Sequence, residues 1–200
     1  MKKSQLEPCV DNAVQLLAID DNRNPSFSPL LWDGKAPNQT VEQIWMPGVH
    51  ADIGGCSDGR FLGNMALLTM LDRMKAHCPE VEFDDDYIGT VRRALQEAKS
   101  IAVTNERPGI GRKLLLRRRR MIGAASDEYV HPIVPALSGA KVLVRGRERV
   151  YQPRNLPNEM GTAEVGEPDL TVLLDTTKRL IGTGQTAPDP AQPGPAGAAA

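Results

Sequence analysis

The stretch that decides the fold is VEQIWMPGVHADIGG, residues 41–55. Its first six residues are mostly apolar or β-forming and end at Pro47-Gly48, as a buried strand does at its carboxyl end. His50, Asp52 and a glycine pair follow, and the apolar-periodic segment 61–74 then predicts a well-buried helix. A strand, a polar turn that carries histidine and a helix are typical of an open α/β sheet, whose reactive groups lie at the strand ends.

Three parts of the chain resemble one known family. WMPGVHADIGG at 45–55 resembles the signature of a bacterial and fungal α/β-hydrolase family that includes phospholipase effectors delivered by type VI secretion. Matching flanks occur at LAIDDNR (17–23), FSP (27–29), LW (31–32), VHPIV (130–134) and YQPRNLP (151–157). The resemblance runs in order from about Val10 to Pro157.

This resemblance implies the carboxyl-terminal portion of an α/β-hydrolase fold, with late strands and helices. In the family, the elbow serine, the oxyanion-hole loop and most of the parallel sheet precede the segment that starts here near Val10. We therefore expect residues 1–160 to form this part of the domain and residues 161–181 to be a short appended segment. Residues 182–200, dominated by Pro, Gly and Ala, are predicted to be a disordered tail.

Other elements are predicted from local patterns. Apolar residues at helical spacing predict a helix over 11–19, and an amphipathic helix is predicted over 87–102 with Asp86 as its cap. Short apolar pieces at 142–144 and 150–151 flank a charged RGRER segment and suggest a hairpin. One more strand or short helix is expected over 169–174.

His50 is the predicted general acid/base. An α/β-hydrolase carries its nucleophile, acid and histidine in that chain order, and the acid holds the imidazole tautomer. By resemblance Asp20 is the expected acid, with Asp21 next, although helix-end and turn roles remain open for both. Asp52 is too close to His50 in sequence to be the usual triad acid. It is expected to bond backbone N–H groups of the histidine loop, while Gly54 and Gly55 let that loop turn. A turn histidine held by backbone bonds is the alternative for His50.

The nucleophile is the difficult assignment. GCSDG at 55–59 fits G-x-S-x-G and suggests a triad of Ser57 with Asp127 and His131. A nucleophile elbow requires a buried strand just before its first glycine, whereas HADIG precedes it here, so we do not assign Ser57. Cys56 has no evident activating partner. We expect a fragment or remnant of a serine-type ester hydrolase that is not active alone.

His77 and His131 are expected to be structural, His77 as a cation at a helix end. Three cysteines without CxxC spacing suit a reducing cytosol and indicate neither a disulfide framework nor a zinc site. The expected chemistry needs no metal or organic cofactor. A cytoplasmic location is expected, with export by type VI secretion as part of a longer protein, because the sequence has no signal peptide or membrane span.

The expected partner is an ester or phospholipid substrate, once a missing amino-terminal half completes the site. The net charge of −1 gives no reason to expect nucleic acid. The basic run at 112–120 is interpreted first as a solvated or salt-bridged face, with lipid headgroup contact at Arg117–Arg120 as the second alternative and a nucleic-acid patch as the third. A second hypothesis is a non-catalytic interaction module or pseudoenzyme remnant that binds a partner through an exposed sheet flank or this patch.

Overall fold

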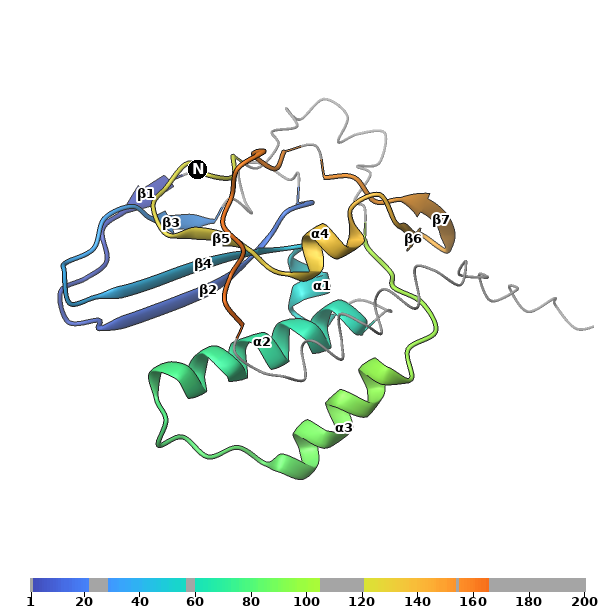
Figure 1. Cartoon of the computed structure of the whole chain (residues 1–200), viewed down its shortest axis with the longest axis horizontal. Helices are drawn as coiled ribbons and strands as arrows, with labels where there is room; N and C mark the ends of the chain where they lie inside the picture. The colour runs from blue at the N-terminus through green and yellow to red at the C-terminus, as the bar shows by residue number, and fades with distance from the viewer. Residues whose placement is uncertain (1, 22–28, 57–59, 105–120, 154, 166–200) are drawn as a thin grey trace, which may run out of the picture.

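In the computed structural model, a parallel sheet of three strands forms the centre of the fold (Figure 1). The structure describes residues 2–21, 29–56, 60–104, 121–153 and 155–165. The strands are β2 (Asn12–Ala18), β4 (Thr40–Met46) and β5 (Glu128–Val130), in the order β2-β4-β5. All carboxyl ends of this sheet therefore lie on one side of the molecule.

The central strand β4 is covered on both faces, which explains its nearly continuous apolar sequence. Ile44, Trp45 and Met46 have no exposed surface. On one face the fully buried Gln43 side chain binds the backbone of Trp32, donating to its carbonyl and accepting from its N–H. This confirms the strand predicted before Pro47.

The segment 11–19 is strand β2, so the predicted helix is wrong. β2 pairs with β4 in register from Asn12↔Thr40 to Ala18↔Met46, and seven residues of ladder outweigh a weak helical spacing. Its apolar residues on both faces produce the misleading pattern, because a strand buried on both sides does not alternate.

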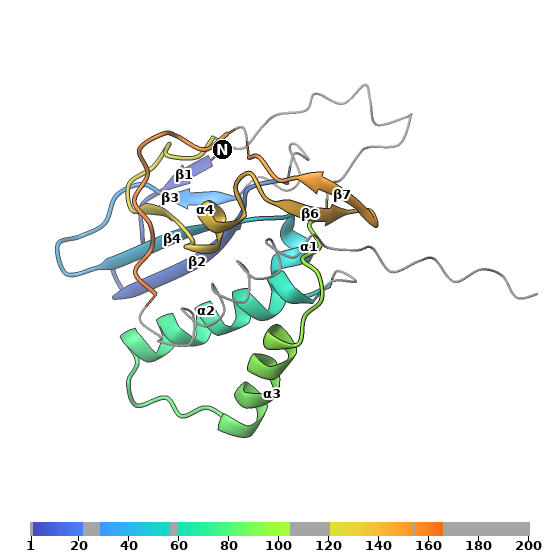
Figure 2. The ribbon, with the colours of Figure 1, turned by 45° about the vertical axis from the view of Figure 1, so that its right-hand side comes forward.

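Helices cover one face of the sheet (Figure 2). The predicted helix after the motif is confirmed as α2 (Phe61–His77), and α3 (Asp85–Gln96) packs against it. Glu42, on the α2-facing side of β4, accepts from His77 at 2.8 Å and lies 3.6 Å from Arg73. Both contacts fix α2 to the sheet.

The second predicted helix has different ends in the structure. The N-cap of α3 is Asp84, whose carboxylate accepts from the Tyr87 N–H, rather than Asp86. The helix ends at Gln96 because the chain beyond it joins another strand: Ile101 and Val103 bond the backbone of Leu143. The helix therefore stops short of 102, because Ile101 is buried in this pairing instead.

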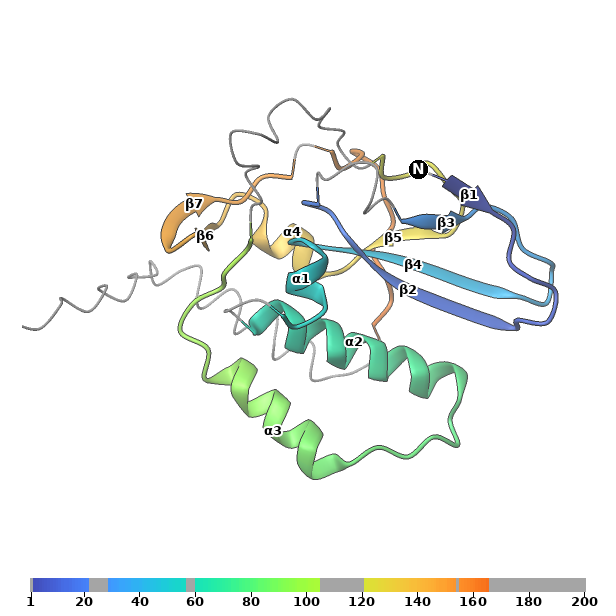
Figure 3. The ribbon, with the colours of Figure 1, turned by 180° about the vertical axis from the view of Figure 1, so that it is seen from behind.

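On the opposite face lies a small sheet of β1 (Lys2–Ser4) and β3 (Leu30–Trp32), paired in parallel. After β5 come α4 (Ile133–Leu137) and the antiparallel hairpin of β6 (Lys141–Val144) and β7 (Arg147–Val150), which confirms the predicted hairpin. Figure 3 shows this hairpin, like α1 (His50–Ile53), near the end of the molecule to which β2 and β4 run.

Some predictions fall outside the described residues. Ser57, the Arg117–Arg120 patch, the element expected over 169–174 and the tail at 182–200 lie there. The described part of the chain beyond 160 continues against the sheet, since Thr162 forms a parallel bridge with Val130.

Candidate functional site

The candidate site lies where β2 and β4 end side by side. Pairing continues past both strands, because the Ile19 N–H donates to the Met46 carbonyl and the Asp20 N–H to the Gly48 carbonyl, both at 3.0 Å. This extension carries Asp21 to the turn that begins with His50. The His50 Nδ1 atom lies 2.6 Å from Asp21 Oδ2.

The pair combines a buried carboxylate with an accessible ring. The Asp21 side chain is fully buried, whereas 47% of the His50 side chain is exposed. An ionised carboxylate only accepts hydrogen bonds, so Nδ1 carries the proton and Nε2 has the lone pair in the neutral ring. A histidine in this tautomer can take a proton at Nε2, and the buried carboxylate stabilises the resulting imidazolium.

Asp20, the first-ranked acid, has a different position. Its Oδ2 atom accepts from the Gly48 N–H at 2.8 Å and from the Tyr151 hydroxyl at 2.9 Å. The pKa of Asp20 is raised to about 6, chiefly by burial and to a smaller extent by the nearby charge of Asp52, against the lowering effect of the two hydrogen bonds. The carboxylate that contacts the imidazole is thus the second candidate, Asp21.

Asp52 anchors the turn that carries His50, in agreement with its predicted role. Its Oδ2 atom accepts from the backbone N–H groups of Val49 and Thr104, each at 2.9 Å. Its Oδ1 atom accepts from the Thr104 hydroxyl at 2.6 Å. The short helix α1 is therefore tied to the segment that leads away from α3.

Two glycines allow this turn to pack closely. Gly48 has φ of +94°, and a Cβ atom there would lie 2.5 Å from Asp52 Oδ2. Gly63, in the first turn of α2, passes so close that an added Cβ would lie 2.6 Å from the Gly55 Cα atom. Of the predicted glycine pair, Gly55 takes a positive φ of +73°, whereas Gly54 has an ordinary φ of −76°.

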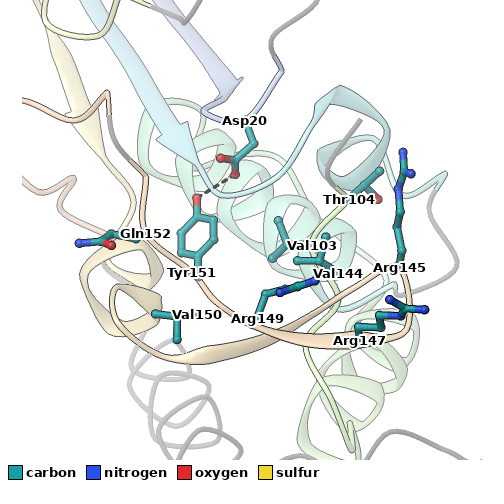
Figure 4. A pocket seen from close by; sticks show the side chains of 10 residues that line it. All are labelled: Asp20, Val103, Thr104, Val144, Arg145, Arg147, Arg149, Val150, Tyr151 and Gln152. Carbon is teal, nitrogen blue, oxygen red and sulfur yellow. Dashed lines mark hydrogen bonds between the residues drawn. The ribbon is translucent and has the colours of Figure 1, made fainter. Parts of the chain in front are cut away.

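A cavity of about 600 Å³ opens next to Asp20 (Figure 4). Its wall comes from the β6–β7 hairpin and from the segment after α3. Figure 4 shows the Tyr151 ring below Asp20, with its hydroxyl directed at the carboxylate. Burial and the charge of Asp20 raise the pKa of Tyr151, which keeps the phenol protonated and donating.

His131 has the environment of a structural histidine. It is fully buried, and burial lowers its pKa to about 3. Thr69 donates its hydroxyl hydrogen to the Met65 carbonyl and so accepts from His131 Nε2 at 2.9 Å, while Nδ1 accepts from the Ile133 N–H. The ring is neutral, with both nitrogens satisfied.

The other members of the GCSDG triad do not come together. Asp127 pairs with Lys35 at 2.7 Å, whereas His131 contacts Thr69 and Ile133. Cys56 is an exposed free thiol. His77 contacts Glu42, so its predicted role at the helix end is supplemented by a contact with the sheet.

The sequence did not reveal Tyr151, Thr104 or the hairpin arginines as neighbours of the site. Tyr151 lies within the family-like YQPRNLP segment, but 131 residues separate it from its partner Asp20. Thr104 lies just beyond residue 102, the predicted end of the second helix, whereas α3 ends at Gln96. Within the described ranges, no group of three or more His, Cys, Asp or Glu residues could hold a metal, and no helix is long and apolar enough to cross a membrane.

A histidine oriented by a buried carboxylate at the ends of parallel strands is typical of hydrolytic enzymes that activate a nucleophile. Residues 1–73 match the family model described as the type VI secretion system (T6SS) phospholipase effector Tle1-like, catalytic domain. The match covers just over a third of the chain and includes Asp20, Asp21 and His50. This part of the chain is thus similar to the catalytic domain of T6SS phospholipase effectors. No curated protein and no solved structure matches it.

Proposed function

We propose that His50 and Asp21 are the acid–base pair of a serine-type ester hydrolase related to T6SS phospholipase effectors. The observation that carries this proposal is the 2.6 Å contact between His50 Nδ1 and the buried Asp21 carboxylate. The chain order, acid before histidine, is the order of an α/β-hydrolase triad. The match of residues 1–73 to a catalytic-domain model supports the same assignment.

In the proposed mechanism His50 takes the proton of the nucleophile through Nε2 and later gives it to the leaving alkoxide. Asp21 fixes the tautomer and stabilises the imidazolium. Asp20 and Tyr151 hold the Gly48 turn and so position the ring indirectly. We propose that the nucleophilic serine comes from a preceding part of an α/β-hydrolase domain, of which this chain is the carboxyl-terminal portion.

The first test measures hydrolysis of a short-chain nitrophenyl ester by the 200-residue chain and by a longer chain that restores a preceding segment. We expect activity in the longer chain, and losses of about 10³- to 10⁴-fold in kcat for His50→Ala and Asp21→Asn. Asp20→Asn should retain much more activity because that carboxylate contacts Tyr151 and Gly48. Fluorophosphonate should label a serine outside GCSDG.

Two outcomes would contradict parts of this proposal. Full activity of His50→Ala in a folded, active longer chain would remove the acid–base assignment. Activity of the 200-residue chain alone that disappears in Ser57→Ala would assign the nucleophile to the GCSDG segment. Circular dichroism of every variant separates loss of chemistry from loss of folding.

A non-catalytic interaction module is the second candidate function. The observation that favours it is the position of β2 at the edge of the central sheet in the described part of the chain. Val14 and Leu16 of this strand are half-buried, and an edge of seven residues could pair with another chain. A folded longer chain without esterase activity that binds a partner through this edge would favour this function.

A further inference from the structure

The cavity next to Asp20 has a cationic wall that the proposed acid–base chemistry does not use. The wall is the β6–β7 hairpin, whose two-residue turn consists of Arg145 and Gly146, both with positive φ. Such a turn matches the natural twist of two strands and holds them in a fixed register. The hairpin therefore presents its side chains in a defined register.

Side chains alternate between the two faces of a strand, so every second residue of β7 lies on the cavity side. In β7 and just beyond it, Arg147, Arg149 and Tyr151 alternate with Glu148 and Val150. Val144 lies directly opposite Arg147 in the antiparallel register and so shares its face. One face thus carries two guanidinium groups, a valine and the tyrosine that binds Asp20. Figure 4 shows Arg147, Arg149 and Tyr151 around the same hollow.

The hairpin's own acidic residue does not neutralise these arginines. Glu148 belongs to the opposite face, where it lies 3.3 Å from Lys141. Arg147 and Arg149 are both exposed, so their guanidinium groups are accessible to a ligand. Val103 and Val144 add apolar surface to the cavity. The lining is therefore amphipathic, cationic on one part and aliphatic on another.

We propose that this cavity binds the phosphate group of a small phosphodiester, with Arg147 and Arg149 as its ligands. Guanidinium groups match phosphate oxygens in bidentate geometry, and the valines provide contact for an apolar substituent. If the cavity selects which ester is hydrolysed, that role rests on the proposed function. The binding itself is independent of turnover. A lipid headgroup and free inorganic phosphate share the required chemistry, and the experiment distinguishes them.

The test is an NMR titration of the full chain, following backbone amides and arginine Nε–H signals. The probes are inorganic phosphate, glycerophosphocholine, and dihexanoyl phosphatidylcholine below its micelle concentration. We expect saturable shifts at Arg147, Arg149 and Tyr151. Affinity should fall about tenfold in Arg147→Gln/Arg149→Gln, since each charge-assisted contact contributes to it. Lys141→Gln, on the other face of the same hairpin, is the matched control and should change affinity less than about twofold.

Each outcome decides a specific point. Tighter binding of dihexanoyl phosphatidylcholine than of inorganic phosphate identifies a lipid headgroup as the source, and the reverse identifies free phosphate. Equal affinity of wild type and the double arginine variant overturns the inference, as does absence of saturable binding of all three probes to folded wild type. His50→Ala should bind like wild type, so failure of the acid–base proposal is seen separately from failure of this one. Thermal melts confirm that the variants fold.

Discussion

Two adjacent aspartates, Asp20 and Asp21, have different roles because the backbone directs them to different partners. Asp21 contacts the imidazole of His50, whereas Asp20 accepts from Gly48 and Tyr151. Neither assignment can be derived from the sequence, since both residues follow the same strand and either could meet the histidine. The choice depends on the direction of each side chain after β2, which the pairing with β4 sets.

At the residue scale, the first prediction concerns Asp20 and pH. The pKa of Asp20 is about 6 in the folded protein against an ordinary value of 3.8, so the folded state binds more protons between these values. The contribution of Asp20 to stability is therefore fully present below about pH 4 and is lost as pH rises through 6. The whole change is on the order of 3 kcal/mol.

Urea unfolding of wild type and Asp20→Asn at pH 4.5, 5.5, 6.5 and 7.5 measures this effect. The stability of wild type relative to the variant should fall from pH 4.5 to 6.5 and then level off. Tyr151→Phe is the comparison variant: it removes a hydrogen bond that lowers the pKa, so its own pH-dependent loss should move to higher pH. A wild-type advantage that grows with pH would mean that the ionised carboxylate is favoured and that our account of the burial is wrong.

The turn between β4 and α1 provides the prediction at the scale of the element. Gly48→Ala forces a side chain into a positive φ and toward the Asp52 carboxylate, which holds Val49 and Thr104. We expect a loss of about 2–4 kcal/mol in the free energy of unfolding, from backbone strain together with displaced hydrogen bonds.

Gly89→Ala is the matched control for that substitution. Gly89 lies within α3, and an added Cβ there has no neighbour within 4 Å. Alanine should stabilise this helix by about 0.5–1 kcal/mol. Chemical denaturation gives both values, and a Gly48→Ala protein as stable as wild type would show that the turn adjusts without cost.

Elements differ in how far the sequence alone predicts them. β4, α2 and the hairpin were predicted because each has a local signal: an apolar run that stops at proline, a long apolar helix, and two short apolar pieces around a charged turn. β2 and the end of α3 were not, because pairing with distant strands decides both. His50 and Asp52 lie within one short motif, so the sequence indicates both as candidate site residues. The Asp20–Tyr151 contact joins residues far apart in the chain and depends on the assembled fold.

For the whole molecule, the layered arrangement predicts which residues are most resistant to local unfolding. β4 is bonded to β2 on one side and to β5 on the other, and both its faces are covered. Native-state hydrogen exchange should therefore be slowest in residues 43–46 and considerably faster in the β6–β7 hairpin, whose strands form a separate sheet. Equal protection in both regions would indicate that the hairpin and the sheet unfold as one unit.

The separation of the hairpin from the central sheet also bears on how such a protein could diverge. The contact between His50 and Asp21 depends on the register of β2 and β4, where a change in either strand disturbs the other. The arginines and valines of the cavity wall come mostly from a hairpin whose β7 strand pairs with β6 alone among the described strands. Mutations in β7 can therefore accumulate with little effect on the histidine and its carboxylate, so that the cavity wall can change while the His50–Asp21 contact keeps its geometry.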